Sequence, residues 1–389
     1  MQPSAPERGF PEAEFAARTA KAQDRMIQDG LAGLLFMTEP EVAYFTGFQT
    51  LFWQSPTRPW FLFVPAAGKP IAIIPEIGAE LMRQTWLDVI RTWSAPCPED
   101  DGISLLTDLL APLAKAGDRI GVMKGHETQL RMPLEDWERL VADLPGLHIA
   151  DATRLVQHLR MVKSEAEIEK LAHICAIGSA TFARVPELVS EGMPLEDVFR
   201  AFRREALAQG ADNAPYLVGA AAPGGYADVI SPPSRRPLQT GDVMMLDTGC
   251  VWDGYFCDFD RNWAIGHADD ATRQAYDTLW RATEAGLEAA IPGNTCKDLF
   301  RAMSEVIAEI DPSGGDIGRL GHGLGLQLTE QPSHAAFDET ILEEGMVLTL
   351  EPSLSYGSGL MMVHEENIVV RNRGAELLTT RAPQSLIVI

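Results

Sequence analysis

Two β-prone runs of the sequence, residues 243–252 and 255–261, carry aspartates on either side of an Asp-Gly pair. Asp-Gly between such runs is a strong signal for a two-residue hairpin turn. In the register set by this turn, Asp247 and Asp258 become diagonal neighbours about 7 to 8 Å apart on one face. Carboxylates at this separation can reach two metal ions about 3.5 to 4 Å from each other. The hairpin therefore favours a dinuclear metal site, while solvent-facing aspartates are the alternative that it leaves open.

The last third of the sequence adds three more side chains that can bind metal. His322 lies between two glycines, which let the backbone come close to an ion. Glu351 follows the apolar run 346–350, and Glu365 precedes the apolar run 368–370. A carboxylate in such a setting is costly to bury without a cation. Together with the two aspartates, these residues form the donor set that two divalent ions need.

The elements before these residues are typical of an α/β domain. Short apolar runs alternate with amphipathic stretches between residues 31 and 151. We expect strands at 31–37, 60–65, 70–75 and 119–123, and helices at 77–86, 103–116 and 133–143. Gly117 follows the second of these helices and is a typical stop signal.

A second section begins where Ser164-Glu-Ala-Glu167 has the spacing of a capping box and opens a long helix through Val189. Beyond it, strands around 243–265 and after residue 346 are separated by helices between 270 and 310. The fold class is therefore α+β. We predict an N-terminal domain over residues 1–158 and a second, metal-binding domain over residues 159–389.

Composition and charge narrow the class of protein. The chain has 389 residues, 46% of them hydrophobic and 22% charged, which is typical of a globular protein with two domains. A net charge of -23 without a Lys/Arg cluster argues against nucleic acid as a partner. No stretch approaches the roughly 20 apolar residues of a membrane helix, and the first ten residues do not resemble a signal peptide. Five cysteines without a Cys-x-x-Cys pair argue against disulfides and structural zinc, so we expect a cytoplasmic protein.

The motifs resemble those of the M24 metallopeptidase family, the pita-bread enzymes that include aminopeptidase P, prolidase, methionine aminopeptidase and creatinase. The family's Asp-x-Gly strand, with a second aspartate eleven positions after the first, is similar to Asp247-Thr-Gly249 and Asp258. Its metal histidine is similar to His322. Its Glu-Pro pair and its last glutamate are similar to Glu351-Pro352 and Glu365.

The resemblance covers the whole chain, because Tyr44–Phe48 and Arg160–Ser164 are similar to signatures of the creatinase and prolidase branch. It implies a pita-bread catalytic domain after a smaller creatinase-type N-terminal domain. It also implies a homodimer and two divalent metal ions. Manganese is the first choice, and zinc, cobalt or iron also suit this ligand set.

The resemblance also implies a role for each ligand. Asp258 and Glu365 would bridge both ions, and Asp247 would hold one of them. His322 and Glu351 would hold the other. A water molecule between two cations would attack the scissile carbonyl, with Glu351 as the catalytic proton shuttle.

The sequence departs from the family pattern at three histidines that peptidase members use around the substrate. The position seventeen residues before Asp247 is Ile230, which we keep as a substrate-pocket position. The position seven residues after His322 is Thr329, and the position four residues before it is Gly318. None of the replacements has an imidazole, which puts ordinary Xaa-Pro peptidase activity in doubt.

Other side chains are candidates for the missing roles. Thr329 and Glu330 could supply a hydrogen bond and a carboxylate, so both are candidate catalytic residues; a solvent-facing Glu330 is the alternative. Asp260 stands where the family often has threonine. His364 is a candidate substrate-binding residue, and His334 is another possible substitute, although a histidine beside a metal ligand more often supports that ligand.

An aromatic and basic cluster at residues 52–60 is a second candidate substrate-binding region. In a family-like homodimer, Trp53 and Arg58 could reach the partner subunit's pocket and contact a small cationic or carboxylate substrate. The alternative is a core strand of the N-terminal domain with a flanking loop. We prefer that alternative for Trp60.

Three functions therefore compete. The first is a metal-dependent Xaa-Pro peptidase of the aminopeptidase P or prolidase type, acting on small peptides. The second is a small-molecule hydrolase or lyase on the same scaffold, like the creatinase, ectoine hydrolase and dimethylsulfoniopropionate lyase branches, favoured by the missing histidines. The third is a non-catalytic binding protein, which the complete ligand set argues against.

Overall fold

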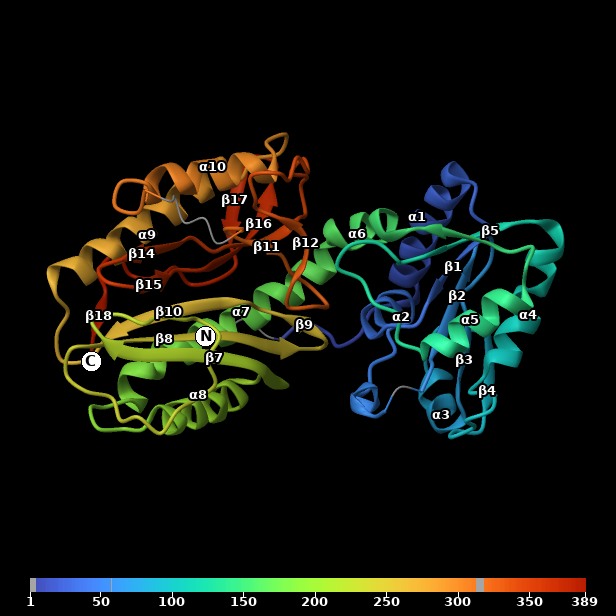
Figure 1. Cartoon of the computed structure of the whole chain (residues 1–389), viewed down its shortest axis with the longest axis horizontal. Helices are drawn as coiled ribbons and strands as arrows, with labels where there is room; N and C mark the ends of the chain where they lie inside the picture. The colour runs from blue at the N-terminus through green and yellow to red at the C-terminus, as the bar shows by residue number, and fades with distance from the viewer. Residues whose placement is uncertain (1–4, 57, 313–317) are drawn as a thin grey trace. The chain divides into compact units, whose positions relative to one another are not determined.

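The computed structural model describes residues 5–56, 58–312 and 318–389. Contacts divide the chain into two compact units, one formed by Glu7–Arg160 and the other by Met1–Pro6 with Met161–Ile389 (Figure 1). The boundary predicted at residue 158 lies inside helix α6 (Thr153–Met161), and the division between the units falls at the end of this helix. Each unit has its own hydrophobic core.

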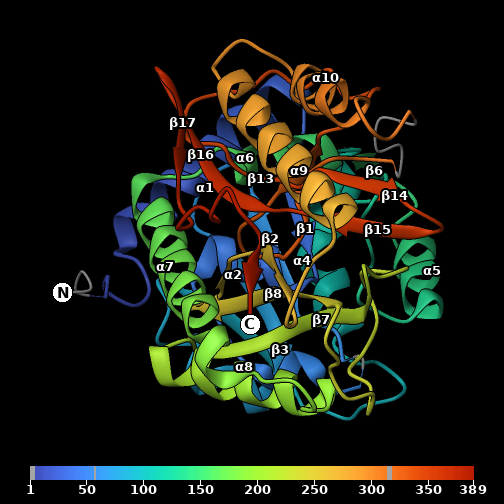
Figure 2. The same ribbon diagram turned by 90° about the vertical axis from the view of Figure 1, so that its left-hand side faces the viewer.

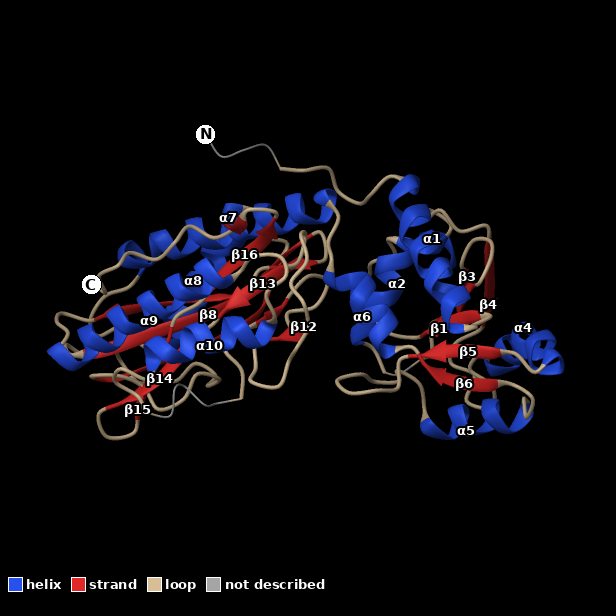
Figure 3. Ribbon diagram, turned by 90° about the horizontal axis from the view of Figure 1, so that it is seen from above, coloured by secondary structure: helices blue, strands red, loops and turns tan. Residues whose placement is uncertain are grey.

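A six-stranded mixed sheet forms the first unit. Its strands are β1 (Gly33–Phe36), β2 (Phe61–Pro65), β3 (Ile71–Pro75), β4 (Val89–Trp93), β5 (Arg119–Val122) and β6 (His148–Asp151). Its other helices are α1 (Glu12–Asp29), α2 (Glu39–Thr46), α3 (Ala79–Met82), α4 (Ile103–Ala116) and α5 (Leu134–Asp143), with 3₁₀ turns η1 (Leu51–Gln54) and η2 (Glu76–Gly78). The strand order is β4-β3-β2-β1-β5-β6. Helices α4 and α5 share a core with the sheet, near β5 and β6 in Figure 3.

Most elements expected in this unit are confirmed. The four expected strands and the helices at 103–116 and 133–143 form within two residues of their expected ends. The helix expected at 77–86 is wrong, since only α3 is α-helical there and η2 precedes it. At Gly78, where η2 ends, the backbone lies so close to Trp60 that an added Cβ would be 2.4 Å from the Trp60 ring.

The second unit contains four helices and three sheets within its described residues. The helices are α7 (Glu165–Leu188), α8 (Leu195–Gln209), α9 (Asp270–Ala289) and α10 (Cys296–Ile307). One sheet, ordered β18-β10-β8-β7, contains β7 (Asn213–Pro223), β8 (Asp242–Trp252), β10 (Phe259–Ala264) and β18 (Ile387–Val388), with β9 (Tyr255–Phe256) paired to β8. Another, ordered β12-β11-β13-β16-β17, contains β11 (His322–Gly323), β12 (Glu330–Ser333), β13 (Val347–Leu350), β16 (Glu366–Arg371) and β17 (Gly374–Leu377). The third pairs β14 (Ser353–Tyr356) with β15 (Leu360–Val363).

Helices cover the two larger sheets of this unit. Helices α7 and α8 pack on β8 and β7, whereas α9 packs on α10 and on strands of the other sheet (Figures 1 and 2). Strand β10 contacts β16, so the two sheets meet between the helix pairs. The predicted capping box is present at the start of α7, where Ser164 and Glu167 exchange side-chain hydrogen bonds to backbone amides. The α+β class predicted for the chain is confirmed.

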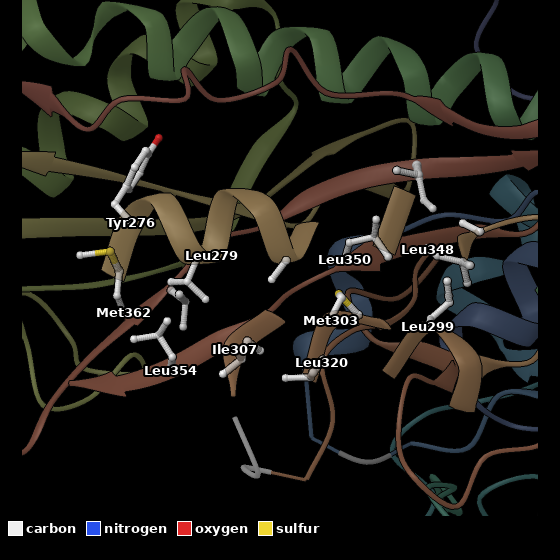
Figure 4. Close-up of a cluster of buried hydrophobic side chains, with 14 of the residues drawn as sticks. Tyr276, Leu279, Leu299, Met303, Ile307, Leu320, Leu348, Leu350, Leu354 and Met362 are labelled. Carbon is white, nitrogen blue, oxygen red and sulfur yellow. The ribbon is translucent and has the colours of Figure 1, made fainter. Parts of the chain in front are cut away.

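A hydrophobic cluster supports the segments that carry two of the candidate ligands. It combines side chains of α9, α10, β13, β14 and β15 with Leu320 (Figure 4). Leu350 of this cluster directly precedes Glu351, and Leu320 lies two residues before His322. Both leucines are fully buried. Burial of these apolar neighbours therefore fixes the backbone from which the two ligands project.

Two further expectations concern membranes and cysteines. In the described ranges, no helix is both long enough and apolar enough to span a membrane. All five cysteines are free, and four of them are buried.

Candidate metal centre

The hairpin that carries Asp247 and Asp258 forms in the predicted register. Asp253 and Gly254 have φ values of 50° and 82°, as a type I′ turn requires at both central positions. Strand β8 pairs with β10 without a register shift, and Asp247 lies directly opposite Asp260. Asp247 and Asp258 are therefore diagonal neighbours on one face of the sheet.

His322 projects from a loop whose backbone is tightly packed. Gly321 has a φ of 138°, and a Cβ at this position would lie 2.5 Å from both His334 Cδ2 and Thr349 O. The His322 amide donates to Thr349 Oγ1 at 3.0 Å, and its Nδ1 lies 2.8 Å from Gly323 O. Because a carbonyl oxygen only accepts, Nδ1 carries the hydrogen. The lone pair of Nε2 is then available for a cation.

The predicted ligands gather around the His322 ring. One candidate ligand atom from each of Asp258, His322 and Glu365 lies within 4.8 Å of the others, and all three residues are buried. His322 Nε2 is 3.4 Å from Asp258 Oδ2 and 3.7 Å from Glu351 Oε2. Asp247 is close enough to the other carboxylates for its charge to raise the pKa of Asp258 and of Glu365. The fold therefore brings the five side chains into one site.

Several oxygen atoms of this site have no hydrogen-bond partner. Asp247 Oδ1, Glu351 Oε2 and Glu365 Oε1 are buried, and none bonds to another described residue. A buried carboxylate oxygen without a partner is unfavourable unless a cation neutralises it. Four carboxylates and one imidazole match the charge and the donor preference of two divalent ions. The residues present therefore fit a two-metal centre.

Burial and mutual repulsion change the protonation of these groups. Burial raises the pKa of Asp247 to about 7, and the charge of Glu351 adds to this effect. Burial also raises the pKa of Glu351 to about 7. The pKa of Asp258 and that of Glu365 lie well above their ordinary values, first through burial and then through the neighbouring carboxylates. Burial lowers the pKa of His322 to about 3, so the ring is neutral. Divalent ions would relieve the repulsion and keep the carboxylates ionised at neutral pH.

Two side chains outside the predicted set hold ligand backbones in place. Asn367 Oδ1 accepts from the Asp258 amide at 2.9 Å, and its Nδ2 donates to Asp258 O. Arg261 Nη1 donates to Glu365 O at 2.7 Å. Sequence reasoning missed Asn367, whose only signal is an amide side chain two residues after a ligand, at the start of an apolar run.

Tyr216 is a further residue beside the site that sequence reasoning missed. Burial raises the pKa of the Tyr216 hydroxyl, and the nearby charge of Asp247 raises it further. The cross-strand partner of Asp247 in β7 is Val218. Tyr216 precedes Val218 by two residues, so its side chain is on the same face of the sheet as that of Asp247. Finding Tyr216 requires the pairing of β7 with β8, which no local pattern indicated.

The catalytic candidate Glu330 begins β12, and the other candidate, Thr329, directly precedes it. Glu330 Oε2 is 3.2 Å from Lys163 Nζ, and the two side chains are only 6% and 2% exposed. The other carboxylate oxygen of Glu330 accepts from the Gln327 amide at 3.1 Å. The alternative interpretation, in which Glu330 faces solvent, is therefore wrong, because this side chain forms a buried ion pair with Lys163. Thr329 is partly buried beside it.

The remaining positions named for the pocket have other surroundings. Ile230 is 75% exposed in the loop between β7 and β8, and Gly318 is also exposed. His364 is buried, and its Nδ1 lies 2.9 Å from Thr283 Oγ1 of α9. His334 is buried as well, with Nε2 at 3.0 Å from a backbone carbonyl of β13. These contacts account for one ring nitrogen of each histidine, while His364 Nε2 and His334 Nδ1 are buried without a hydrogen-bond partner among the described residues.

Trp53 and Arg58 belong to the first unit. The Trp53 ring lies 5.5 Å from the Trp60 ring, and both residues are buried. The Arg131 guanidinium lies 5.0 Å from the Trp53 ring and also donates to Trp53 O at 2.8 Å. Arg58 is half-buried, 5.9 Å from the Phe52 ring. Trp60 is a core residue, as preferred from the sequence, and Trp53 packs with it.

Family comparisons agree with this architecture. The model of metallopeptidase family M24 matches residues 169–372, and the model of the creatinase/prolidase N-terminal domain matches residues 18–162. The first match contains all five candidate ligands. The resemblance identified from the sequence is therefore confirmed.

Individual relatives cover the chain to different extents. The probable dipeptidase PepE of Mycobacterium tuberculosis is 30% identical over 396 residues, covering 98% of each protein. The crystal structure of dipeptidase PepE from Mycobacterium ulcerans superimposes with a TM-score of 0.84 at 28% identity, covering 98% of this chain and 99% of that one. An Xaa-Pro dipeptidase of Pyrococcus furiosus is 28% identical over 225 residues, which is 58% of this chain and 65% of the relative. The chain therefore belongs to metallopeptidase family M24 and carries a creatinase/prolidase N-terminal domain before its catalytic domain.

Proposed function

We propose that the chain is a metal-dependent dipeptidase of the Xaa-Pro type, which hydrolyses the peptide bond before proline in small peptides. The observation that carries the proposal is one buried group of Asp258, His322 and Glu365 with two further carboxylates beside it. The likeness to a probable dipeptidase over the full length, and to an Xaa-Pro dipeptidase over part of it, supports this substrate class.

Glu351 is the proposed proton shuttle of the hydrolysis. When bound, two divalent ions supply Lewis acidity, which lowers the pKa of a water molecule and stabilises the developing oxyanion. The Glu351 side chain is 35% exposed, so it can meet solvent and substrate. Its Oε2 is buried and has no hydrogen-bond partner among the described residues, so it can take a proton from a water molecule held within the site. The same carboxylate can then return this proton to the leaving amine.

Manganese is the proposed metal. The donor set contains four carboxylates and a single imidazole, and hard oxygen donors suit manganese. Zinc, cobalt and iron are the competitors, so metal analysis of the purified protein is the deciding measurement. A site filled by zinc would contradict this choice.

A homodimer and a cytoplasmic location complete the proposal. The five free cysteines support a reducing compartment. The homodimer rests on the family resemblance, and light scattering of the purified protein tests it. A monomer at micromolar concentration would contradict it.

A small-molecule hydrolase or lyase is the second candidate. Specific observations favour it, because Ile230 and Thr329 stand where peptidase members carry histidines and Asp260 stands in place of a threonine. These changes alter the groups available around a substrate. This candidate predicts turnover of a small amide or a related compound without turnover of prolyl dipeptides.

The first experiment is elemental analysis of protein purified without chelator, with Asp258→Ala as its control. We expect about two divalent ions per chain in the wild type and their loss in the variant. A substrate screen of prolyl dipeptides, non-prolyl dipeptides and small amides follows on the same sample. Protein that binds neither manganese nor zinc would contradict a metal-dependent function, and loaded protein that leaves every dipeptide intact would favour the second candidate.

A further inference from the structure

Asp260 is a buried acidic residue of the metal centre that stands outside the five family ligands. We propose that Asp260 is a sixth protein ligand, which binds through Oδ2 the ion held by Asp247. This inference rests on the proposed metal-dependent function. It concerns a position where the family often has threonine, a side chain with no charge.

The register of the hairpin brings Asp260 closer to Asp247 than the predicted ligand pair is to each other. Asp260 is the direct cross-strand partner of Asp247. The Cys257 amide donates to Cys250 O at 3.0 Å, so the 250–257 pair is hydrogen-bonded. Pairs alternate along antiparallel strands, and the 247–260 pair is three positions further on. It is therefore a non-hydrogen-bonded pair, in which Cα atoms are only about 4.5 Å apart and side chains are close.

A hydrogen bond from Asn262 orients the Asp260 side chain. Its Oδ1 accepts from Asn262 Nδ2 at 3.2 Å, and the same nitrogen donates to Val363 O at 2.7 Å. The Asn262 carbonyl oxygen accepts from the Tyr226 hydroxyl at 2.9 Å. Asp260, Asn262 and Tyr226 are at most 4% exposed. Metal-binding carboxylates are commonly oriented by such second hydrogen bonds, with the other oxygen directed at the ion.

The charge of Arg261 acts on Asp260, but Arg261 makes no ion pair with this carboxylate. Across the described ranges, no Lys or Arg forms an ion pair with its carboxylate, and the side-chain hydrogen bond that it accepts is to Oδ1. Arg261 donates to the backbone oxygen of Asp260 and forms its ion pair with Glu366 instead. A buried carboxylate that faces Asp247, whose own Oδ1 is unpartnered, requires a cation. A divalent ion between the two aspartates satisfies both oxygen atoms.

A sixth ligand has a consequence for metal choice. Two divalent ions balance the four carboxylates of the family set, and Asp260 adds one more anionic oxygen donor on the Asp247 side. Additional oxygen donors favour ions that accept six-coordinate geometry, such as manganese, over tetrahedral zinc. The site that contains Asp247 should therefore bind manganese more tightly than the same site would without Asp260.

The test is manganese binding to the full chain, measured by isothermal titration calorimetry and by metal content after dialysis. We compare the wild type with Asp260→Asn and with Asp260→Thr, which introduces the family residue. We expect one of two sites to weaken at least about 10- to 100-fold in both variants, while the other site keeps its affinity. The control is Glu339→Gln, which removes an exposed carboxylate that forms a surface ion pair with Lys297 and is not a candidate ligand. It should leave both affinities unchanged.

Thermal melting in chelator shows whether the variants fold. Both should melt at or above the wild-type temperature without metal, because a buried carboxylate facing Asp247 has been removed, and below it with saturating manganese. Variants that keep two ions at wild-type affinity would overturn the inference and leave the proposed function intact; this is also the result expected if Asp260 serves only a substrate ammonium group. A wild type that binds no divalent ion would overturn both.

Discussion

The side chain of Asn367 pairs with both backbone groups of Asp258, accepting from its amide at 2.9 Å and donating to its carbonyl oxygen. Asn367 belongs to β16 and Asp258 to the link between β9 and β10, so this contact joins the two large sheets of the second unit at a candidate metal ligand. Glu365 lies two residues before Asn367. One buried amide therefore sets the relative position of two ligands from different sheets.

Replacing Asn367 with alanine should weaken the metal centre without removing a ligand. Two buried backbone groups of Asp258 would lose their partner, so we expect a loss of about 2 to 4 kcal/mol in unfolding free energy. We also expect metal affinity to fall about 10- to 100-fold. Urea unfolding and manganese titration measure the two effects. Asn372→Ala, at an exposed position, is the control, and unchanged metal affinity in Asn367→Ala would contradict the role assigned to this contact.

Glu351→Gln should separate catalysis from metal binding. The amide keeps the shape of the side chain but cannot carry the proton, so kcat should fall about 10²- to 10⁴-fold. Metal content of the variant must be measured beside the rate, because Glu351 is also a proposed ligand. Glu344→Gln, on the exposed segment before β13, serves as the control. Full turnover by metal-loaded Glu351→Gln would remove the proton-shuttle role.

Stability of the metal-free protein should fall as pH rises from about 7 to 8. Asp247 and Glu351 have pKa values of about 7 in the folded state, against ordinary values of about 4 when unfolded. The folded state therefore binds more protons, and deprotonation disfavours it. His322 does not oppose this trend, because above pH 7 it is largely neutral in both states. Melting in chelator across this window tests the sign. Saturating manganese should abolish or reverse the slope, and a melting temperature that rises with pH in chelator would contradict the burial of these groups.

Gly321→Ala should disrupt the loop that presents His322. A Cβ at Gly321 would lie 2.5 Å from two neighbouring atoms, and its φ of 138° adds strain. Gly293 is a matched control, with a φ of 94° and no atom within 4 Å of the place that an added Cβ would take. We expect a loss of about 1 to 2 kcal/mol for Gly293→Ala from backbone strain alone. Gly321→Ala should lose at least about 1 to 3 kcal/mol more through overpacking. Equal losses in chemical unfolding would show that the loop tolerates the extra carbon.

Lys163→Met should reveal how firmly Glu330 is tied to a structural ion pair. Removing one partner of a buried pair leaves an uncompensated charge, which costs about 3 to 5 kcal/mol. Lys297→Met breaks the exposed pair with Glu339 and should cost about 0 to 1 kcal/mol. Urea unfolding of both variants gives the comparison. A loss of peptidase rate without a loss of stability in Lys163→Met would instead support a catalytic Glu330.

Local sequence was enough to predict the hairpin and to name the candidate ligands. The Asp-Gly turn sets its own backbone angles, and these set the pairing of β8 with β10. The faces of Asp247, Asp258 and Asp260 follow from that pairing through the two-residue period of a strand. Glu351 was identifiable because a carboxylate after a continuous apolar run needs a reason to be there. These inferences use only neighbours along the chain.

Tertiary structure alone decided what each side chain contacts. Glu330 meets Lys163 across 167 positions of sequence, and Asn367 meets Asp258 across 109. His364 is next to a ligand in sequence, yet its ring bonds to Thr283 of α9. Local periodicity fixes which face a residue occupies, but contacts between distant segments depend on how the sheets and helices pack. The sequence therefore determined which chemistry is present, and the packing of the second unit determined which groups can take part in it.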